Sequence, residues 1–192
     1  MSRSPVALET SSPFILDLEA IKRRARSHIE EGAVTVGYQG DRQQIVKVLN
    51  DSLATELVCM LRYRNHGYMS AALGGSAGFV ISDELMEHSN EEQAHVDKIA
   101  ERITQLGGEP DFNPATLVNR SHADYVTSES LRGMLTEDLV AERIAIETYV
   151  TIVRFIGDRD PTTRRMFEEI LAQEEEHADE LADFLKRLPL GG

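Results

Sequence analysis

One sequence motif occurs twice in this chain, in two segments that are offset by 82 residues and align without a gap. The segments are 91–103, EEQAHVDKIAERI, and 173–185, QEEEHADELADFL. Each contains Glu-x-x-His: Glu92 with His95 in the first, and Glu174 with His177 in the second. In an α-helix, residues i and i+3 lie about 60° apart around the axis and about one turn apart along it. The Glu and the His of each motif can therefore reach one point beside their helix.

A second, fainter repeat links two other segments. Glu56 is followed seven residues later by Tyr63, and Glu142 is followed seven residues later by Tyr149. Positions i and i+7 differ by only about 20° around a helix, so each tyrosine lies on the same face as its glutamate. Both glutamates stand among apolar residues, where a carboxylate is costly unless it is paired or bound to a metal. The chain thus repeats one order of groups: Glu, then Glu-x-x-His.

Helical periodicity and end signals predict four long helices. They cover residues 41–72, 79–106, 130–156 and 161–188, with a break at LGGSAG between the first two. Asp41 is a suitable N-cap for the first, and Asp160-Pro161 gives the fourth an N-cap followed by proline at its first helical position. The first and last connections are short, which favours antiparallel neighbours, whereas residues 107–128 can run the length of a bundle. The predicted fold is all-α, an antiparallel four-helix bundle with one long crossover between its second and third helices.

The segment before these helices has a different character. Residues 1–13 are rich in Ser and Pro and are predicted to form a loose tail. Residues 14–31 carry apolar side chains at helical spacing, which predicts a short amphipathic helix. We therefore expect two parts: an N-terminal tail and short helix over residues 1–40, and the bundle domain over residues 41–192.

Composition narrows the class of protein. The chain has 192 residues and a formal net charge of −13, which attracts cations and repels nucleic acid over most of the surface. The basic cluster at residues 22–26, KRRAR, lies among acidic neighbours, so the sequence supports DNA as a partner only weakly. Cys59 is the single cysteine and is expected to be a small buried hydrophobe. No apolar run is long enough to span a bilayer and no secretory signal is seen, so a cytoplasmic protein without a membrane contact is expected.

The two repeats together indicate more than charged helix surfaces. A single Glu-x-x-His on a charged helix is common and mostly has no function, and Glu91, Glu175 and Glu176 are expected to be solvated. Two such motifs in register, with two isolated glutamates on the other two helices, form the ligand set of a carboxylate-bridged pair of metal ions in a four-helix bundle. The candidate ligands are Glu56, Glu92, His95, Glu142, Glu174 and His177.

The segments that carry these residues resemble the ferritin-like superfamily, and within it bacterioferritin and the Dps-like proteins. The resemblance spans about residues 41–188 and is carried by ATELVCMLRY, EEQAH, EDLVAE and QEEEH. It implies that Glu92 and Glu174 bridge two metal ions. The terminal ligands that it implies are Glu56, His95, Glu142 and His177. It also implies that Tyr63 lies beside the site as a catalytic residue that donates an electron or a hydrogen bond, and that Asp138 orients a ligand histidine.

Two departures from bacterioferritin matter. Bacterioferritin ligates haem with a methionine directly after the bridging glutamate of its second helix; here that residue is Gln93, so no haem is expected. The bacterioferritin bundle is followed by a short fifth helix, whereas this chain ends at LPLGG just after the fourth. The Dps-like group lacks that helix and forms 12-subunit cages. The resemblance therefore implies a homo-oligomer, a hollow cage of 12 subunits.

The function that the resemblance implies is that of an iron-binding ferroxidase. Each subunit would hold two Fe ions, oxidise Fe(II) with H2O2 or O2, and store the iron as ferric mineral in the cage, which protects against oxidative stress. Manganese or zinc could occupy the site in the isolated protein. Three alternatives stay open: a manganese catalase, a rubrerythrin-like peroxide-removing enzyme, and a DNA-coating nucleoid protein. A single cysteine excludes the paired Cys-x-x-Cys module that rubrerythrins usually carry.

Overall fold

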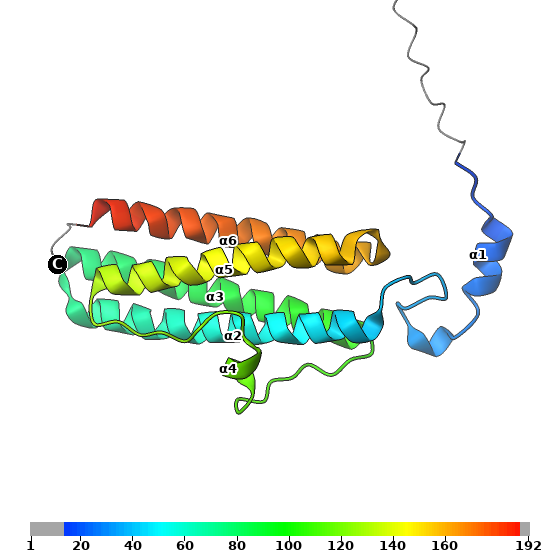
Figure 1. Cartoon of the computed structure of the whole chain (residues 1–192), viewed down its shortest axis with the longest axis horizontal. Coiled ribbons are helices and arrows are strands. Elements are labelled where there is room, and N and C mark those ends of the chain that lie inside the picture. Colours follow the sequence, from blue (N-terminus) through cyan, green and yellow to red (C-terminus); the bar gives the residue numbers. More distant parts are fainter. Residues whose placement is uncertain (1–13, 189–192) are drawn as a thin grey trace, which may run out of the picture. The chain divides into compact units, whose positions relative to one another are not determined.

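The computed structural model describes residues 14–188, which divide into two compact units between Gly37 and Tyr38 (Figure 1). The larger unit is a bundle of four long helices. They are α2 (Arg42–Leu73), α3 (Gly75–Gln105), α5 (Leu131–Ile156) and α6 (Pro161–Arg187). Two shorter elements, α4 (Leu117–Arg120) and the 3₁₀ turn η2 (Gly157–Arg159), lie in the connections. The described residues contain no β-strand.

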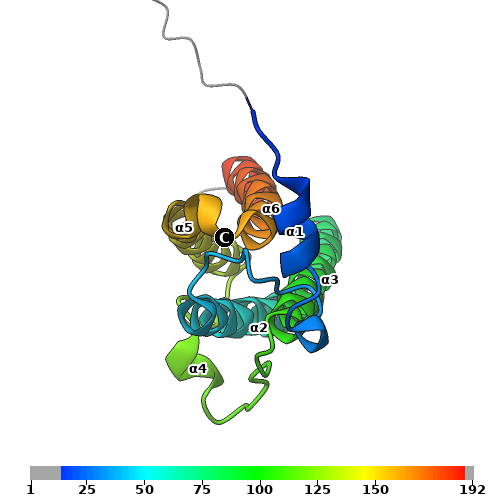
Figure 2. The same ribbon diagram turned by 90° about the vertical axis from the view of Figure 1, so that its right-hand side faces the viewer.

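The connections fix the directions of the four long helices. α2 packs antiparallel to α3, and α5 packs antiparallel to α6 (Figure 1). The crossover between α3 and α5 passes along α2, sets α4 against it, and returns to the end of the bundle at which α3 begins. As a result α5 runs antiparallel to α2, and viewed end-on the four helices surround one core (Figure 2). This is the all-α bundle with a long crossover that the sequence predicts.

The core between the four helices is apolar along most of its length. Its fully buried side chains include Leu49, Leu53, Ile81, Leu85, Ile99, Ile103, Leu135, Phe167 and Leu181. In the crossover, Leu117 of α4 packs on Ala54 and Val58 of α2. Cys59 is 3% exposed, so the prediction that it is a small buried hydrophobe is confirmed. This close-packed core leaves the polar side chains within it little freedom to move.

Side-chain caps fix where the long helices begin. Asp41 accepts a hydrogen bond from the Gln44 backbone N–H at 3.1 Å, and Asp160 accepts one from the Thr163 N–H at 2.9 Å. Pro161 occupies the first position of α6, where the missing N–H has no intrahelical partner to lose. Both predicted N-caps are therefore confirmed.

The turn between α2 and α3 is tighter than predicted. α3 begins at Gly75 rather than near residue 79, because Gly74 and Gly75 adopt φ of 73° and 72° and reverse the chain by themselves. The two helices then run very close together. A Cβ on Gly78 would lie 2.5 Å from the carbonyl oxygen of Ser70, so only glycine fits at this crossing.

The N-terminal unit contains α1 (Leu18–Arg24) and the 3₁₀ turn η1 (Ile29–Glu31). The prediction of one helix over residues 14–31 is therefore wrong in extent. His28 has a φ of 52°, in the left-handed region, and separates the two elements. No residue of α1 is buried, and short helices gain most of their stability from packing. Apolar spacing alone is thus not enough to continue this helix.

Two expectations fall on residues outside the described range: the loose tail over residues 1–13, and the end of the chain after Leu188. Within the described range, none of the helices has the length and apolar character that crossing a bilayer requires.

Candidate metal centre

All six candidate ligands lie in the interior of the bundle. α2 provides Glu56, α5 provides Glu142, and α3 and α6 each provide one Glu-x-x-His pair. None is more than 1% exposed; the six are Glu56, Glu92, His95, Glu142, Glu174 and His177. An ionised carboxylate buried this deeply is unfavourable unless it is paired. Four of them in one place therefore require protons or cations.

The six side chains form two groups that overlap. The first group is Glu56, Glu92, His95 and Glu174, and the second is Glu92, Glu142, Glu174 and His177. Within each group, one ligand atom from every residue lies within 4.8 Å of the others. Glu92 and Glu174, here called the shared glutamates, belong to both groups.

Each shared glutamate turns one oxygen toward each histidine. Glu174 Oε1 lies 3.3 Å from His95 Nδ1, and Glu174 Oε2 lies 3.3 Å from His177 Nδ1. Glu92 is placed in the same way, with Oε2 at 3.9 Å from His95 Nδ1 and Oε1 at 3.5 Å from His177 Nδ1. A carboxylate in this orientation can give one oxygen to each of two ions.

Several atoms of the centre are buried without a hydrogen-bond partner among the described residues. They are Glu92 Oε1, both carboxylate oxygens of Glu174, and Nδ1 of His177. Buried polar atoms nearly always have a partner, and an ion or a water molecule is the usual one where the chain offers none. Carboxylate oxygens with imidazole nitrogens are a common donor set for divalent transition metals. The residues present therefore fit a pair of such cations.

Without cations, the protonation of the glutamates and histidines of the centre is set by their burial and by the closeness of the four carboxylates. Burial raises the pKa of the carboxyls of Glu56 and Glu142, and the charges of the shared glutamates raise it further. Burial alone would lower the pKa of His177, but its contacts with the shared glutamates raise that pKa to about 12. The pKa of His95 is raised in the same way. Without cations, the centre therefore retains protons, which offset the negative charge of the carboxylates.

Two buried tyrosines hold the outer glutamates from the opposite helix. The hydroxyl of Tyr63 donates a hydrogen bond to Glu142 Oε1, and that of Tyr149 donates one to Glu56 Oε1. Both rings are fully buried, and burial raises the pKa of the Tyr63 phenol, which keeps its proton. The resemblance assigns only Tyr63 to the site. The sequence repeat already places Tyr149 on the same face as Glu142, and the structure shows that its hydroxyl serves Glu56 of the opposite helix.

The outward nitrogens of the two histidines also have partners on the opposite helix. His95 Nε2 lies 2.9 Å from Gln173 Oε1, and His177 Nε2 lies 2.8 Å from Glu91 Oε2. Each contact turns Nδ1 of its ring toward the shared glutamates, as outer groups commonly do for ligand histidines. The expectation that Glu91 is only solvated is wrong, because its side chain is 35% exposed and contacts His177. Glu91 aligns with Gln173 in the sequence repeat, which is the signal that could have identified both.

Asp138 does not contact either ligand histidine, contrary to the expectation for it. Its carboxylate accepts a hydrogen bond from Arg62 Nε at 2.9 Å and lies 2.9 Å from His66 Nδ1. Asp138 stands one turn before Glu142 on α5, and at that level of the bundle it faces α2. It stabilises the pairing of α5 with α2 and does not orient a ligand.

Comparisons with known proteins identify the family of the chain. Residues 46–191 match the family described as the ferritin-like domain. The bacterioferritin of Desulfovibrio desulfuricans is 27% identical over 143 residues, which cover 73% of this chain and 74% of that protein. A nutrient stress-induced DNA-binding protein of Nostoc sp. is 31% identical over 150 residues, 74% of this chain and 78% of that protein.

Solved structures share the bundle. The bacterioferritin-related protein of Bacteroides fragilis, described as a dodecameric thioferritin, has a TM-score of 0.71 at 29% identity over 77% of this chain and 88% of that chain. The bacterioferritin of D. desulfuricans, described with its diiron site in different catalytic states, has a TM-score of 0.66 at 25% identity over 76% and 80%. Dps of Thermosynechococcus elongatus, with a TM-score of 0.71 at 19% identity, covers 78% and 96% and supports the fold alone. The predicted ferritin-like four-helix bundle is confirmed, and the chain belongs to the ferritin-like domain family, with bacterioferritins and Dps-like proteins among its relatives.

Proposed function

We propose that this protein is a ferroxidase that oxidises Fe(II) and stores the iron in a homo-oligomeric cage. The oxidation would occur where the two overlapping ligand groups meet, here called the paired centre. One observation carries the proposal: each shared glutamate directs one oxygen toward His95 and the other toward His177. This orientation suits two ions held side by side. The relatives named bacterioferritin support iron as the metal.

The donor set suits two Fe(II) ions as substrates. Four ionised glutamates carry a charge that balances two divalent cations, and two neutral imidazoles complete the set. Iron supplies the redox chemistry: one electron leaves each of two Fe(II) ions, and one H2O2 takes up both electrons and two protons to give two water molecules. Dioxygen, which the same two electrons and two protons reduce to H2O2, is the alternative oxidant.

The residues around the ligands prepare the site for the metal. Gln173 and Glu91 hold the rings of the two histidines, while Tyr63 and Tyr149 hold the outer carboxyls. Imidazole binds a metal only in its neutral form, so the loading of Fe(II) has to displace the protons that the histidines hold. Preorganisation of this kind lowers the cost of assembling the two ions.

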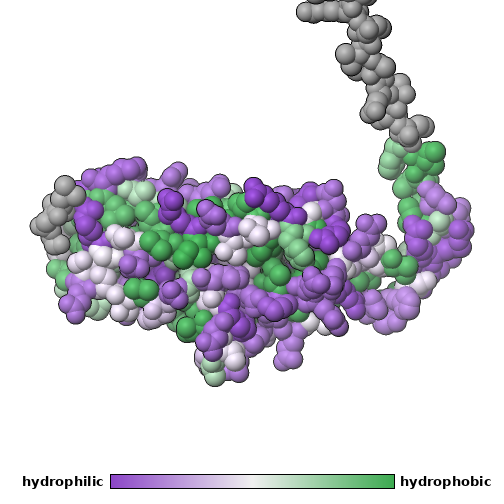
Figure 3. All heavy atoms as spheres, in the orientation of Figure 1, coloured by the Kyte–Doolittle hydropathy of each residue, from purple (hydrophilic) through white to green (hydrophobic). Residues whose placement is uncertain are grey.

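The proposal extends to a hollow cage of 12 subunits. Several large apolar side chains are exposed on α2 and α5: Leu61, Tyr68, Met69, Val140 and Phe155. Figure 3 shows hydrophobic residues gathered on the visible face of the bundle. Exposed apolar patches mark interfaces between proteins, and a dodecameric assembly is described for the relative from B. fragilis. Light scattering is expected to give a mass near 12 times the chain mass of 21.4 kDa.

The direct test is a stopped-flow measurement of iron oxidation. Metal-free protein receives two Fe(II) per subunit without oxygen and is then mixed with H2O2 or O2, and ferric absorbance is followed. We expect fast oxidation that saturates near two irons per subunit, and the faster oxidant separates a Dps-like protective role from a ferritin-like storage role. Oxidation no faster than that of free iron in buffer rejects the ferroxidase. The manganese catalase and the rubrerythrin-like peroxidase would then be tested by peroxide removal.

DNA binding is a second candidate that one relative favours. The Nostoc protein is named as a DNA-binding protein, and here α1 exposes Lys22, Arg23 and Arg24 in its last turn. Replacing these three residues by Glu is expected to abolish DNA retention in a gel-shift assay and to leave iron oxidation unchanged. Failure of the wild-type protein to retain DNA at about 50 mM salt, where phosphate contacts are strong, removes this candidate.

A further inference from the structure

A second cluster of ligand-type side chains lies outside the paired centre, between α3 and α6. A cavity of about 230 Å³ opens there. Its lining consists of two histidines and five glutamates: Glu84, Glu87, His88, Glu91, Glu176, His177 and Glu180. The function proposed above uses only His177 and Glu91 of this set. The remaining residues therefore need an account of their own.

His88 is the centre of this cluster. The residue is 1% exposed, yet Nε2 of its ring lies 2.9 Å from Glu180 Oε2 and 3.7 Å from Glu84 Oε1. The three residues can each offer one ligand atom, and these atoms lie within 4.8 Å of one another. Glu84 and His88 stand four residues apart on α3, hence on one face, and Glu180 reaches them from α6.

The ring of His88 is held firmly but is not fully paired. It stacks on His177 with ring centroids 4.2 Å apart, and its other contact is the edge of Tyr63 at 5.3 Å. Its Nδ1 is buried and has no hydrogen-bond partner among the described residues. The stacking holds the ring so that its other nitrogen, Nε2, is directed at Glu180 and Glu84, and Nε2 is therefore the ligand atom that His88 offers to the cavity.

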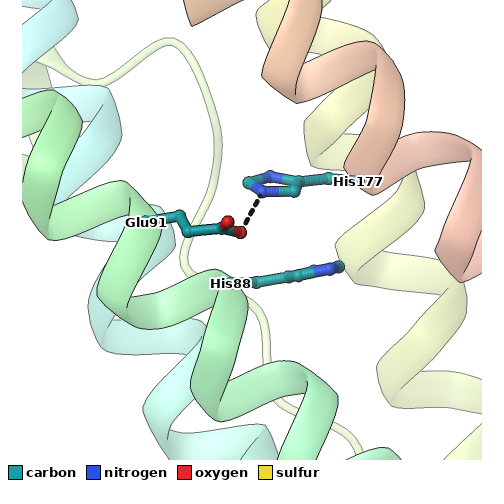
Figure 4. Close-up of side chains that lie close together, drawn as sticks. All are labelled: His88, Glu91 and His177. Atoms are coloured by element: carbon teal, nitrogen blue, oxygen red, sulfur yellow. Dashed lines mark hydrogen bonds and ion pairs between the residues drawn. The ribbon is translucent and has the colours of Figure 1, made fainter.

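His177 is not available to this cluster as a ligand. Its Nδ1 faces the shared glutamates, and its Nε2 is bonded to Glu91 (Figure 4). Figure 4 shows the rings of His88 and His177 lying side by side, with Glu91 reaching toward His177. The ligand set of the cavity is therefore Glu84, His88 and Glu180.

We propose that Glu84, His88 and Glu180 form a separate site for one divalent transition-metal cation. An imidazole with two carboxylates favours Fe(II), Co(II) or Zn(II) over Mg(II) and Ca(II), which prefer sites built from oxygen alone. Three protein ligands leave coordination positions open to solvent, as in exchangeable rather than structural sites. The side chains of Glu84 and Glu180 are 28% and 42% exposed, so the cation can enter and leave directly.

The test measures Zn(II) bound per subunit, because Zn(II) is not oxidised. Purified metal-free protein is equilibrated with Zn(II) at about 0.15 M salt, where weakly attracted surface ions are screened, and tightly bound metal is counted. We expect three Zn(II) per subunit in the wild type and two in both His88→Ala and Glu180→Gln. Glu87→Gln is the matched control: it removes one charge from the same cavity, and we expect it to keep three.

The outcomes separate this site from the paired centre. Glu92→Ala is expected to lose the paired ions and to keep the one at His88. Two Zn(II) in the wild type, or three in Glu180→Gln, overturns the new site and leaves the paired centre intact. One Zn(II) in the wild type that Glu92→Ala retains overturns the paired centre instead. Glu180 is partly exposed, so Glu180→Gln gives a decision even where His88→Ala disturbs the fold.

Discussion

The hydroxyl of Tyr63 on α2 donates a hydrogen bond to Glu142 on α5. With the two helices exchanged, the hydroxyl of Tyr149 on α5 donates a hydrogen bond to Glu56 on α2. Both glutamates precede the tyrosine of their own helix by seven residues, and the two helices run antiparallel, so each tyrosine meets the glutamate of the other helix. The centre thus has an approximate twofold arrangement that follows from the sequence repeat and the antiparallel packing.

Removing one of these hydroxyls is expected to destabilise the metal-free protein more than the loaded one. Tyr149→Phe leaves the buried Oε1 of Glu56 without its donor, at a cost of about 1–3 kcal/mol, while Oε2 keeps its contact with His95 Nδ1 at 3.1 Å. A bound cation gives the carboxylate another partner, so the loss should shrink when Zn(II) is present. Urea unfolding at one protein concentration, with and without Zn(II), measures the loss of stability in the loaded and in the metal-free protein. Tyr125→Phe, at a ring that is 44% exposed, is the control, and an equal loss in both states would contradict the prediction.

Ligand variants should separate the paired centre from its charged surroundings. Glu92→Ala removes a shared carboxylate and His177→Ala removes a ligand of the second group, so both should reduce iron oxidation to the rate in buffer while circular dichroism stays helical. Glu175→Ala should change neither, because this side chain is exposed on α6. The opposite pattern, with Glu175→Ala inactive and Glu174→Ala active, would show that the assigned register of α6 is wrong.

The helices, their caps and the positions of the ligands could be predicted because they rest on local rules. Glu-x-x-His at i and i+3 faces one point wherever the helix lies, and Asp160-Pro161 starts a helix irrespective of its neighbours. The break at LGGSAG is predicted, but the start of α3 at Gly75 is not, because two consecutive glycines with positive φ leave no trace in hydrophobic periodicity.

Partners on other helices could not be predicted from local rules. Asp138 was expected to serve a ligand histidine, but the rotation of α5 turns it toward Arg62 and His66 of α2. Glu91 was expected to be solvated because it stands in a charged run, yet it meets His177 across the bundle. Sequence spacing places a side chain on a face of its own helix, whereas the partner depends on how two helices pack.

The contacts behind the histidines are expected to control metal affinity. Glu91→Ala frees the outer nitrogen of His177, so the ring loses its fixed orientation; a loss of about 10–100-fold in Zn(II) affinity is typical of such groups. Competition with a chelator measures it. Glu87→Ala, at an exposed position of α3 in the same cavity, is the matched control. Equal affinities for both variants would mean that Glu91 does not orient the ring.

The pH dependence of stability is expected to differ in sign between the metal-free and the loaded protein. The carboxylates raise the pKa of His177 from 6.5 to about 12, so the folded metal-free state keeps a proton that the unfolded chain releases above pH 6.5. The contribution of His177 to the free energy of unfolding is fully present below pH 6.5 and declines as pH rises toward 12. Each such proton lowers the free energy of unfolding by at most about 1.4 kcal/mol per pH unit. The raised pKa of Glu56 and Glu142 acts in the same direction.

Urea unfolding between about pH 6.5 and 9 tests this sign, because histidines whose pKa is lowered, His88 and His122, release their protons below that window. Metal-free protein should lose stability across the window. Zn(II)-loaded protein should gain stability across the window. Protons and Zn(II) bind to the same ligand atoms, so Zn(II) binds more tightly as the proton concentration falls. His177→Ala should make the metal-free curve shallower, and the raised pKa values of His95, Glu56 and Glu142 account for the slope that remains. A metal-free stability that is constant or rises with pH would mean that the buried carboxylates do not hold protons on the histidines.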